Sequence, residues 1–267
     1  MTSSTNAPVT PARVEPPPIV EVRAVSKVYP GDVTALSAIS LDFPDGQLTS
    51  LLGPSGCGKT TLLKIIAGLI PVTSGEVRIN GRKVTGPGPE RSFVFQDFAL
   101  MPWATVLRNA AFGLELRGIA RSEREAVAEG YLAQVGLKGF EQKYPHELSG
   151  GMRQRVGLAR ALVVNSAVIL MDEPFSAVDE QTRRKFQEDL LELTARERKT
   201  FIFVTHSIEE AVYISDRIAL ISPRPGRVSQ IIDVAIPRRG DADAIRRHPT
   251  YLDSVESIWR GLRQYLE

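Results

Sequence analysis

Apolar and polar residues alternate in three stretches of the first eighty positions. The clearest is Ile19–Val25 (IVEVRAV), whose alternation is typical of a strand with one buried face. Ala38–Phe43 (AISLDF) is a second candidate, and it is stopped by the turn sequence Pro44-Asp45-Gly46. The third, Gly75–Gly81 (GEVRING), closes in Asn-Gly, a strong hairpin signal. Together these stretches predict an antiparallel β layer.

Helical spacing replaces this alternation between residues 97 and 164, after a short apolar strand at Arg91–Phe95. One helix is predicted to begin near Ser122, because Ser122 and Glu125 have the spacing of a capping box. Its expected inner face consists of Val127, Tyr131, Leu132 and Val135. A second helix presents Val156, Ala159, Leu162 and Val163. The segment therefore reads as a helical subdomain.

Short apolar strands then return at Ala167–Met171, Thr200–Thr205 and Arg217–Ser222. A helix over Gln181–Arg198 separates the first two, with Phe186, Leu190 and Leu193 predicted to face inward. Strands that alternate with helices indicate an α/β fold with a covered parallel sheet. The last stretch, Pro249–Glu267, is amphipathic, and two readings stay open: a helix packed on the body or a regulatory helix. Its apolar positions are Leu252, Val255, Ile258, Trp259 and Leu262.

Composition narrows the class of protein. The chain has 267 residues, of which 43% are hydrophobic, so it can bury a sizeable core. The net charge of +2 gives no general field for a polyanion, so nucleic acid is not an expected partner. The single cysteine, Cys57, excludes an internal disulfide. We find no signal peptide and no run of about 20 apolar residues that would span a membrane, so the expected location is cytoplasmic.

The strongest chemical signal is Leu51–Leu63 (LLGPSGCGKTTLL). Gly53, Gly58, Lys59 and Thr60 fit the phosphate-binding pattern G-x-x-x-x-G-K-[ST]. Glycines let backbone N–H groups approach a phosphate, the lysine adds positive charge, and the Thr60 hydroxyl can ligate Mg²⁺. The predicted strand Gln47–Leu52 leads into the loop, and a helix with apolar residues Leu62, Leu63, Ile65, Ile66 and Leu69 leads out. This context predicts nucleotide binding.

Two further sites belong with that loop. Asp172 and Glu173 end an apolar strand, so Asp172 is predicted to hold Mg²⁺ and Glu173 to accept a proton from water. Ser149-Gly150-Gly151 precedes a helix and forms a second candidate anion site, or merely a flexible turn with a helix cap. A second phosphate site is explained if it closes over nucleotide held by another copy of the chain, which predicts a two-fold dimer.

In this order, the motifs of Ile19–Ile232 resemble the ATP-binding subunit of an ABC transporter. The resemblance implies a P-loop NTPase (RecA-like) core with a parallel sheet, an antiparallel β layer and an inserted helical subdomain. Three segments are expected. Residues 1–18, rich in Ser, Thr, Ala and Pro, would be a disordered tail. The ATPase domain would cover 19–232, with its helical subdomain at about 97–164, and a C-terminal helical extension would cover 233–267.

The resemblance assigns roles to named residues. ATP would contact the loop residues Gly53, Pro54, Ser55, Gly56, Cys57, Gly58, Lys59, Thr60 and Thr61. Mg²⁺ would be held by Thr60, Gln96 and Asp172, and the catalytic residues would be Glu173, His206 and Gln96. The signature residues Ser149, Gly150 and Gly151 and the D-loop Ser176–Asp179 would meet the nucleotide or the second copy, with Asp179 as a nucleotide-side residue. Tyr29 fits the aromatic that stacks on adenine, although it could equally be a plain surface residue.

Departures from the family pattern are small: Met152 stands where glutamine is usual, and Val178 where leucine is common.

Three stretches resemble importers of nitrate, aliphatic sulfonates, taurine or bicarbonate: Met101–Arg117, LSGGMRQRV and Ile221–Arg227. That subgroup implies an ATPase peripheral to the cytoplasmic face of the inner membrane, with transmembrane permease subunits and, indirectly, a substrate-binding protein as partners. Met101–Trp103 is either plain packing or a permease contact.

Three alternatives were weighed against this interpretation. A soluble ABC ATPase of DNA repair or chromosome structure would carry long heptad insertions, whereas only a compact helical segment lies between Gly53 and Ser149. A small-molecule P-loop kinase would lack Leu148–Gly151 and His206 at these places. The ATPase of an exporter or lipid transporter stays open.

Overall fold

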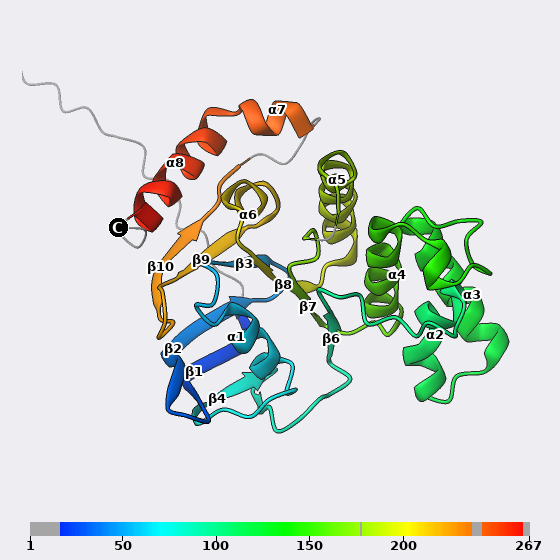
Figure 1. The fold of residues 1–267 in the computed structure, drawn as a ribbon, viewed down its shortest axis with the longest axis horizontal. Helices are drawn as coiled ribbons and strands as arrows, with labels where there is room; N and C mark the ends of the chain where they lie inside the picture. The colour runs from blue at the N-terminus through cyan, green and yellow to red at the C-terminus, as the bar shows by residue number, and fades with distance from the viewer. Residues whose placement is uncertain (1–16, 177, 237–241, 264–267) are drawn as a thin grey trace, which may run out of the picture.

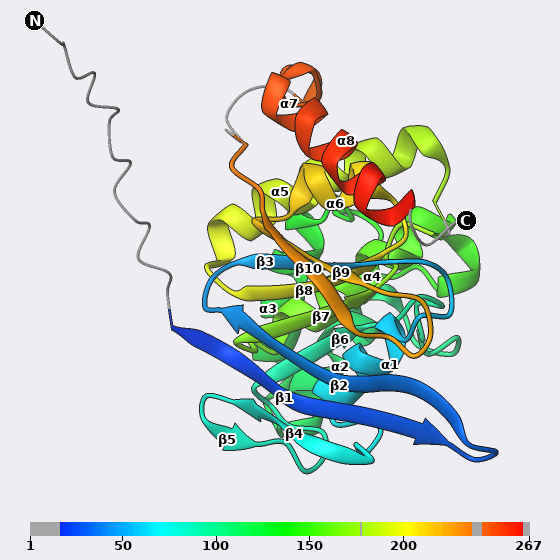
Figure 2. The same cartoon turned by 90° about the vertical axis from the view of Figure 1, so that its left-hand side faces the viewer.

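A computed structural model describes residues 17–176, 178–236 and 242–263. Two sheets form its frame (Figures 1 and 2). The four-stranded sheet has the order β2-β1-β4-β5 and is antiparallel. Its strands are β1 (Pro18–Tyr29), β2 (Val33–Pro44), β4 (Ser74–Ile79) and β5 (Arg82–Lys83). The predicted antiparallel layer is therefore confirmed, and Asn80-Gly81 forms the turn into β5 with φ of 50° and 71°.

The six-stranded sheet has the order β10-β9-β3-β8-β7-β6. Its strands are β3 (Leu48–Leu52), β6 (Arg91–Val94), β7 (Val168–Asp172), β8 (Thr200–Thr205), β9 (Arg217–Ile221) and β10 (Val228–Asp233). Neighbouring strands run parallel except at the β10 edge. The predicted parallel sheet is confirmed; β10 is an added edge strand that the sequence analysis missed.

Helices cover both faces of this sheet. Helix α1 (Lys59–Ile66) lies between the two sheets, and its Leu62, Leu63, Ile65 and Ile66 belong to the same buried cluster as residues of β1, β2 and β4. The opposite face carries α5 (Glu180–Glu197), α6 (Ile208–Ile214), α7 (Ala242–Arg247) and α8 (Pro249–Arg263). Phe186, Leu190 and Leu193 of α5 are buried as expected. Leu69, by contrast, lies beyond α1 and is 44% exposed.

Three helices form a group at one end of the molecule: α2 (Val106–Leu116), α3 (Arg121–Gln134) and α4 (Gly150–Val163) (Figure 1). A short 3₁₀ turn, Pro145–Glu147, precedes α4. The predicted inner face of α4, Val156, Ala159, Leu162 and Val163, is buried. The helical character expected for this stretch is thus present.

Details of two helices differ from the prediction. Helix α3 starts after Ala120, which offers no side-chain cap, and Glu125 pairs with Arg121 instead of closing a box with Ser122. Val127 is 39% exposed, because the buried strip of α3 runs through Ala128 and Leu132. In α8 the buried positions are Tyr251 and Ile258, whereas Leu252 and Trp259 are about half exposed.

A buried amide side chain, that of Asn109, holds the segment that leads into the helical group. Asn109 on α2 is fully buried, and its Nδ2 donates to the carbonyls of Met101, Ala104 and Thr105. Its Oδ1 accepts the N–H of Met101 at 2.8 Å. The Met101 N–H and the Ala104 carbonyl depend on this side chain, whereas the Met101 and Thr105 carbonyls also accept backbone N–H groups.

Replacing Asn109 by alanine is expected to destabilise the protein by about 2–3 kcal/mol, since the freed backbone groups keep their desolvation cost. Urea unfolding would measure this. Arg108→Ala is the matched control, because Arg108 is its exposed neighbour and makes a surface pair with Glu115. Equal stability of the two variants would contradict this account.

Candidate nucleotide site

The phosphate loop connects β3 to α1, as the strand–loop–helix pattern predicts. Gly58 ends the loop with φ 106° and caps the helix. Lys59 is only 5% exposed, and its ammonium donates to the carbonyls of Gly53 at 2.7 Å and Pro54 at 3.0 Å. The Lys59 ammonium therefore lies on the concave side of the loop, where it would contact an anion bound by the backbone N–H groups.

Neighbouring segments support the loop at close range. A Cβ on Gly53 would lie 2.4 Å from the carbonyl oxygen of Ile221 on β9, so this position has no room for a side chain. Arg224, in the turn after β9, donates to the carbonyl of Gly56 at 3.3 Å. Gly226 of the same turn is held to β2 through the N–H of Ser37 and the carbonyl of Ala35. The motif Ile221–Arg227 therefore supports the phosphate loop, a role that its sequence alone did not indicate.

The parallel sheet brings Asp172 to the loop. Its Oδ1 accepts the hydroxyl proton of Thr60 at 2.7 Å, so both predicted Mg²⁺ ligands from these two segments converge. Burial raises the pKa of the Asp172 carboxyl above its ordinary value, although the Thr60 hydrogen bond and the charges of Lys64 and Lys59 oppose this. A hydroxyl and a carboxylate are oxygen donors of the kind that Mg²⁺ prefers, so the pair fits this ion.

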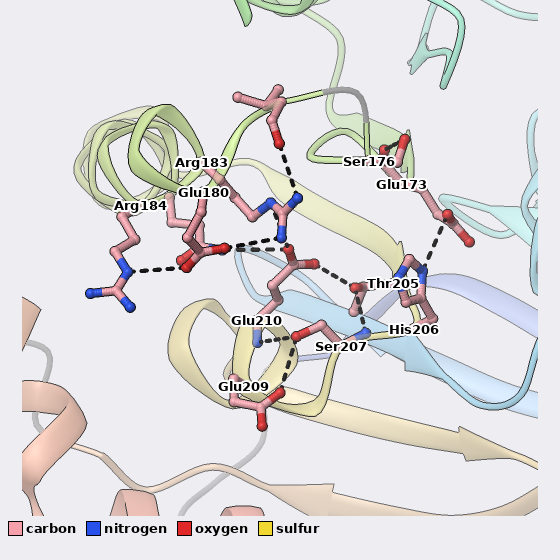
Figure 3. Close-up of polar contacts among 12 residues, drawn as sticks. Glu173, Ser176, Glu180, Arg183, Arg184, Thr205, His206, Ser207, Glu209 and Glu210 are labelled. Carbon is pink, nitrogen blue, oxygen red and sulfur yellow. Dashed lines mark hydrogen bonds and ion pairs between the residues drawn. The ribbon is translucent and has the colours of Figure 1, made fainter.

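Glu173 and His206 come together at the ends of two adjacent strands (Figure 3). Asp172 pairs with Val204 in the β7–β8 register, and the N–H of Glu173 donates to the carbonyl of Val204. The Glu173 Oε2 lies 3.3 Å from Nδ1 of His206, whose side chain is 60% exposed. Glu173 has a φ of 44°, a strained conformation for a glutamate and one that proteins often hold at functional positions.

Tyr29 lies at the end of β1 and beside α1. Its hydroxyl is 3.3 Å from the Thr61 hydroxyl, and its ring is 37% exposed. The ring is thus available next to the loop, as an adenine contact requires. Cys57 is different: its thiol is buried, and burial raises its pKa, so the thiol stays protonated at neutral pH and is not a reactive nucleophile.

The remaining predicted residues lie elsewhere. Ser149 caps α4 by accepting the N–H of Met152, and a Cβ on Gly151 would come 2.9 Å from Cγ2 of Thr182 on α5. Helix α4 packs on α2, α3, α5 and β6, whereas α1 packs on β2, β7 and β8. The structure therefore does not join Ser149, Gly150 and Gly151 to this chain's own phosphate loop.

Gln96 and Asp179 complete the predicted set. Gln96 is exposed in the segment after β6. Asp179 caps α5, and the N–H of Thr182, donating to its Oδ1 at 3.0 Å, lowers the pKa of the carboxyl. Ala177 of the predicted D-loop lies outside the described residues.

Comparison with known proteins decides the family. The sequence pattern of the ABC transporter family matches residues 36–176, more than half of the chain. The chain belongs to the ABC transporter family. It is an ATPase whose hydrolysis of ATP is coupled to transport, and it has the α/β cassette fold that was expected.

Its relatives agree with that assignment. The ABC protein is 50% identical to an uncharacterised ABC transporter ATP-binding protein of Methanocaldococcus jannaschii over 80% of both chains. It is 46% identical to a taurine import ATP-binding protein of Pseudomonas syringae pv. tomato, over 90% of this chain and 94% of the relative. The name of this second relative agrees with the importer subgroup suggested by the sequence.

Among solved structures, the ABC protein resembles a dimeric ATP-binding cassette in a post-hydrolysis state bound to ADP and Pi. The TM-score is 0.72 and the identity 33%, over 83% of this chain and all of that one. Across the described ranges, none of the ABC protein's helices is both long and apolar enough to span a bilayer.

Gly53→Ala is expected to lower the free energy of unfolding by about 1–3 kcal/mol and to weaken ATP binding, since its Cβ would press on the backbone of β9. Gly86→Ala is the matched control, because a Cβ there has no atom within 4 Å. Chemical unfolding and nucleotide titration would measure both effects; wild-type behaviour of Gly53→Ala would refute the close packing.

Proposed function

We propose that the ABC protein is the ATP-hydrolysing subunit of an importer and that two copies close on two Mg·ATP. The observation that carries the dimer is the separation of the two anion sites: the phosphate loop starts α1, whereas Ser149–Gly151 starts α4 and packs against α5. Each loop would then be completed by the signature residues of the other copy. The resemblance to a dimeric cassette supports this arrangement.

Within each half, the residues divide the work of phosphoryl transfer. Lys59 and the loop N–H groups would hold the β- and γ-phosphates, and Tyr29 would stack on adenine. Thr60 and Asp172, with Gln96, would hold Mg²⁺, which would offset the negative charge of the phosphate groups. Glu173 would accept a proton from the attacking water, and His206, 3.3 Å from it, would contact the γ-phosphate. Catalysis is then mainly positioning and electrostatics.

The transported solute is proposed from the relatives. Several of them are named for taurine import, which favours taurine or a similar small anion such as nitrate or a sulfonate. The solute would pass through a separate permease after delivery by a binding protein, with the ABC protein attached to the cytoplasmic face of the inner membrane.

Glu173→Gln is expected to slow ATP hydrolysis at least about 100-fold, because it removes the base but keeps the side-chain shape. The variant should accumulate as an ATP-bound dimer, detectable by light scattering after size exclusion. Glu192→Gln, an exposed acid on α5, is the control and should behave as wild type. Hydrolysis by Glu173→Gln at the wild-type rate would show that Glu173 is not the base.

The permease contact is proposed at a groove of the helical group. Trp103 is 74% exposed and lines a groove of about 370 Å³ together with residues of α2 and α3 and with Tyr144. An exposed tryptophan beside a groove is typical of an energetically important contact between proteins.

Trp103→Ala is expected to weaken binding to the permease at least about tenfold, as loss of a central aromatic contact does. Co-purification of the permease with tagged ABC protein would measure the effect. Leu116→Ala is the control: Leu116 is equally exposed, at 73%, but does not line the groove. Unchanged assembly of Trp103→Ala would place the permease on another surface.

A further inference from the structure

Hydrogen bonds and ion pairs form an incomplete ring through Glu173, the first turn of α5, Glu210 and His206 (Figure 3). On the Glu173 side, its carbonyl accepts both the N–H and the hydroxyl of Ser176, at 3.1 and 2.9 Å. Two positions further on, the carbonyl of Val178 accepts Nη2 of Arg183 at 2.9 Å. Ser176 is therefore bonded to Glu173, and Val178 to the first turn of α5.

Glu210 of α6 makes the contacts on the His206 side of the ring. Its Oε2 accepts the hydroxyl of Thr205 at 2.6 Å, and the same hydroxyl oxygen accepts the N–H of Ser207 at 3.0 Å. The N–H of Glu210 in turn donates to the Ser207 hydroxyl at 3.2 Å. Both neighbours of His206 are thus bonded to Glu210 on α6, Thr205 through the carboxylate and Ser207 through the backbone N–H.

Arg183 on α5 and Glu210 on α6 face each other, between the Glu173 side and the His206 side of the ring. The Arg183 Nε lies 3.9 Å from Oε1 of Glu210, which is beyond hydrogen-bond range. That Nε atom is buried without a hydrogen-bond partner, so a small approach of α5 toward α6 would complete a charged hydrogen bond. Burial raises the pKa of Glu210, whereas the Thr205 hydrogen bond and the charges of Arg183 and His206 favour its ionised form.

We propose that Arg183 and Glu210 are positioning residues for ATP hydrolysis, which couple the segment after Glu173 to His206 across the α5–α6 contact. Neither side chain touches the reacting atoms; each acts through the backbone that carries Glu173 or His206. The proposal rests on the roles proposed above for Glu173 and His206. Gly151 packs against Val178 and Thr182, so the ring also adjoins the signature residues that would meet the other copy.

Steady-state ATPase kinetics of the full-length protein test the proposal. Arg183→Ala and Glu210→Ala are each expected to lower kcat about tenfold, as a small misplacement of reacting groups does, with KM changed less than about twofold. Glu210→Gln keeps an oxygen for the Thr205 hydroxyl and should retain more activity than Glu210→Ala. Arg196→Ala is the matched control, since Arg196 is another arginine of α5 and pairs with the exposed Glu192 at the surface.

A double-variant cycle distinguishes a positioning effect on His206 from a general loss of structure. His206→Ala should lower kcat by itself, and adding Glu210→Ala should lower it no further, because Glu210 acts through the backbone that carries His206. Arg183→Lys keeps a cation and the aliphatic stem but removes the forked set of guanidinium donors. This variant should fold even if Arg183→Ala does not. Its kcat should still fall at least about threefold.

Three results would overturn the inference. The first is wild-type kcat in Arg183→Lys and Glu210→Ala. The second is a loss in the double variant that equals the product of the single losses, which would indicate an independent structural effect. The third is wild-type kcat in His206→Ala alone; this would refute the role proposed for His206 and, with it, the coupling.

Discussion

The parallel register of β3, β8 and β7 is the constraint on which the site depends. It sets Leu52 beside Thr205 and Val204 beside Asp172, so the phosphate loop, His206 and Glu173 all emerge at one edge of the sheet. A slip of one residue in any of these pairings would turn its side chains to the opposite face and separate the reacting groups. Strands buried on both faces hold this register, because their apolar side chains pack against α1 below and α5 and α6 above.

Much of this arrangement could be predicted from sequence because it depends on local signals. Local sequence preference agrees with the final fold at the loop glycines and Lys59, in the apolar strands and at the Asn80-Gly81 turn. The capping box at Ser122 failed since the local signal was weak: Arg121 competes for Glu125, and packing on α2 and α4 decides where α3 begins. In α8, the outward direction of Trp259 depends on how the helix lies on α6, which spacing alone does not define.

Contacts between distant segments were beyond sequence reasoning. In the sequence, Arg183 belongs to the basic run Arg183-Arg184-Lys185 and Glu210 follows another acid, and both patterns are typical of solvated surfaces. Only the packing of α5 against α6 shows that both are partly buried and face each other. The support of the loop by Arg224 and Gly226 is similar, because 168 residues separate Arg224 from Gly56.

The burial of Cys57 has a practical consequence for spectroscopy. As the chain's single sulfhydryl, it is sealed beneath the loop and kept protonated, so thiol-specific dyes and spin labels would react with it slowly. A cysteine introduced at an exposed position of the helical group would then carry the label almost alone, with no need for a cysteine-free background. Pairs of such labels would report the distance between two copies as nucleotide is bound and hydrolysed.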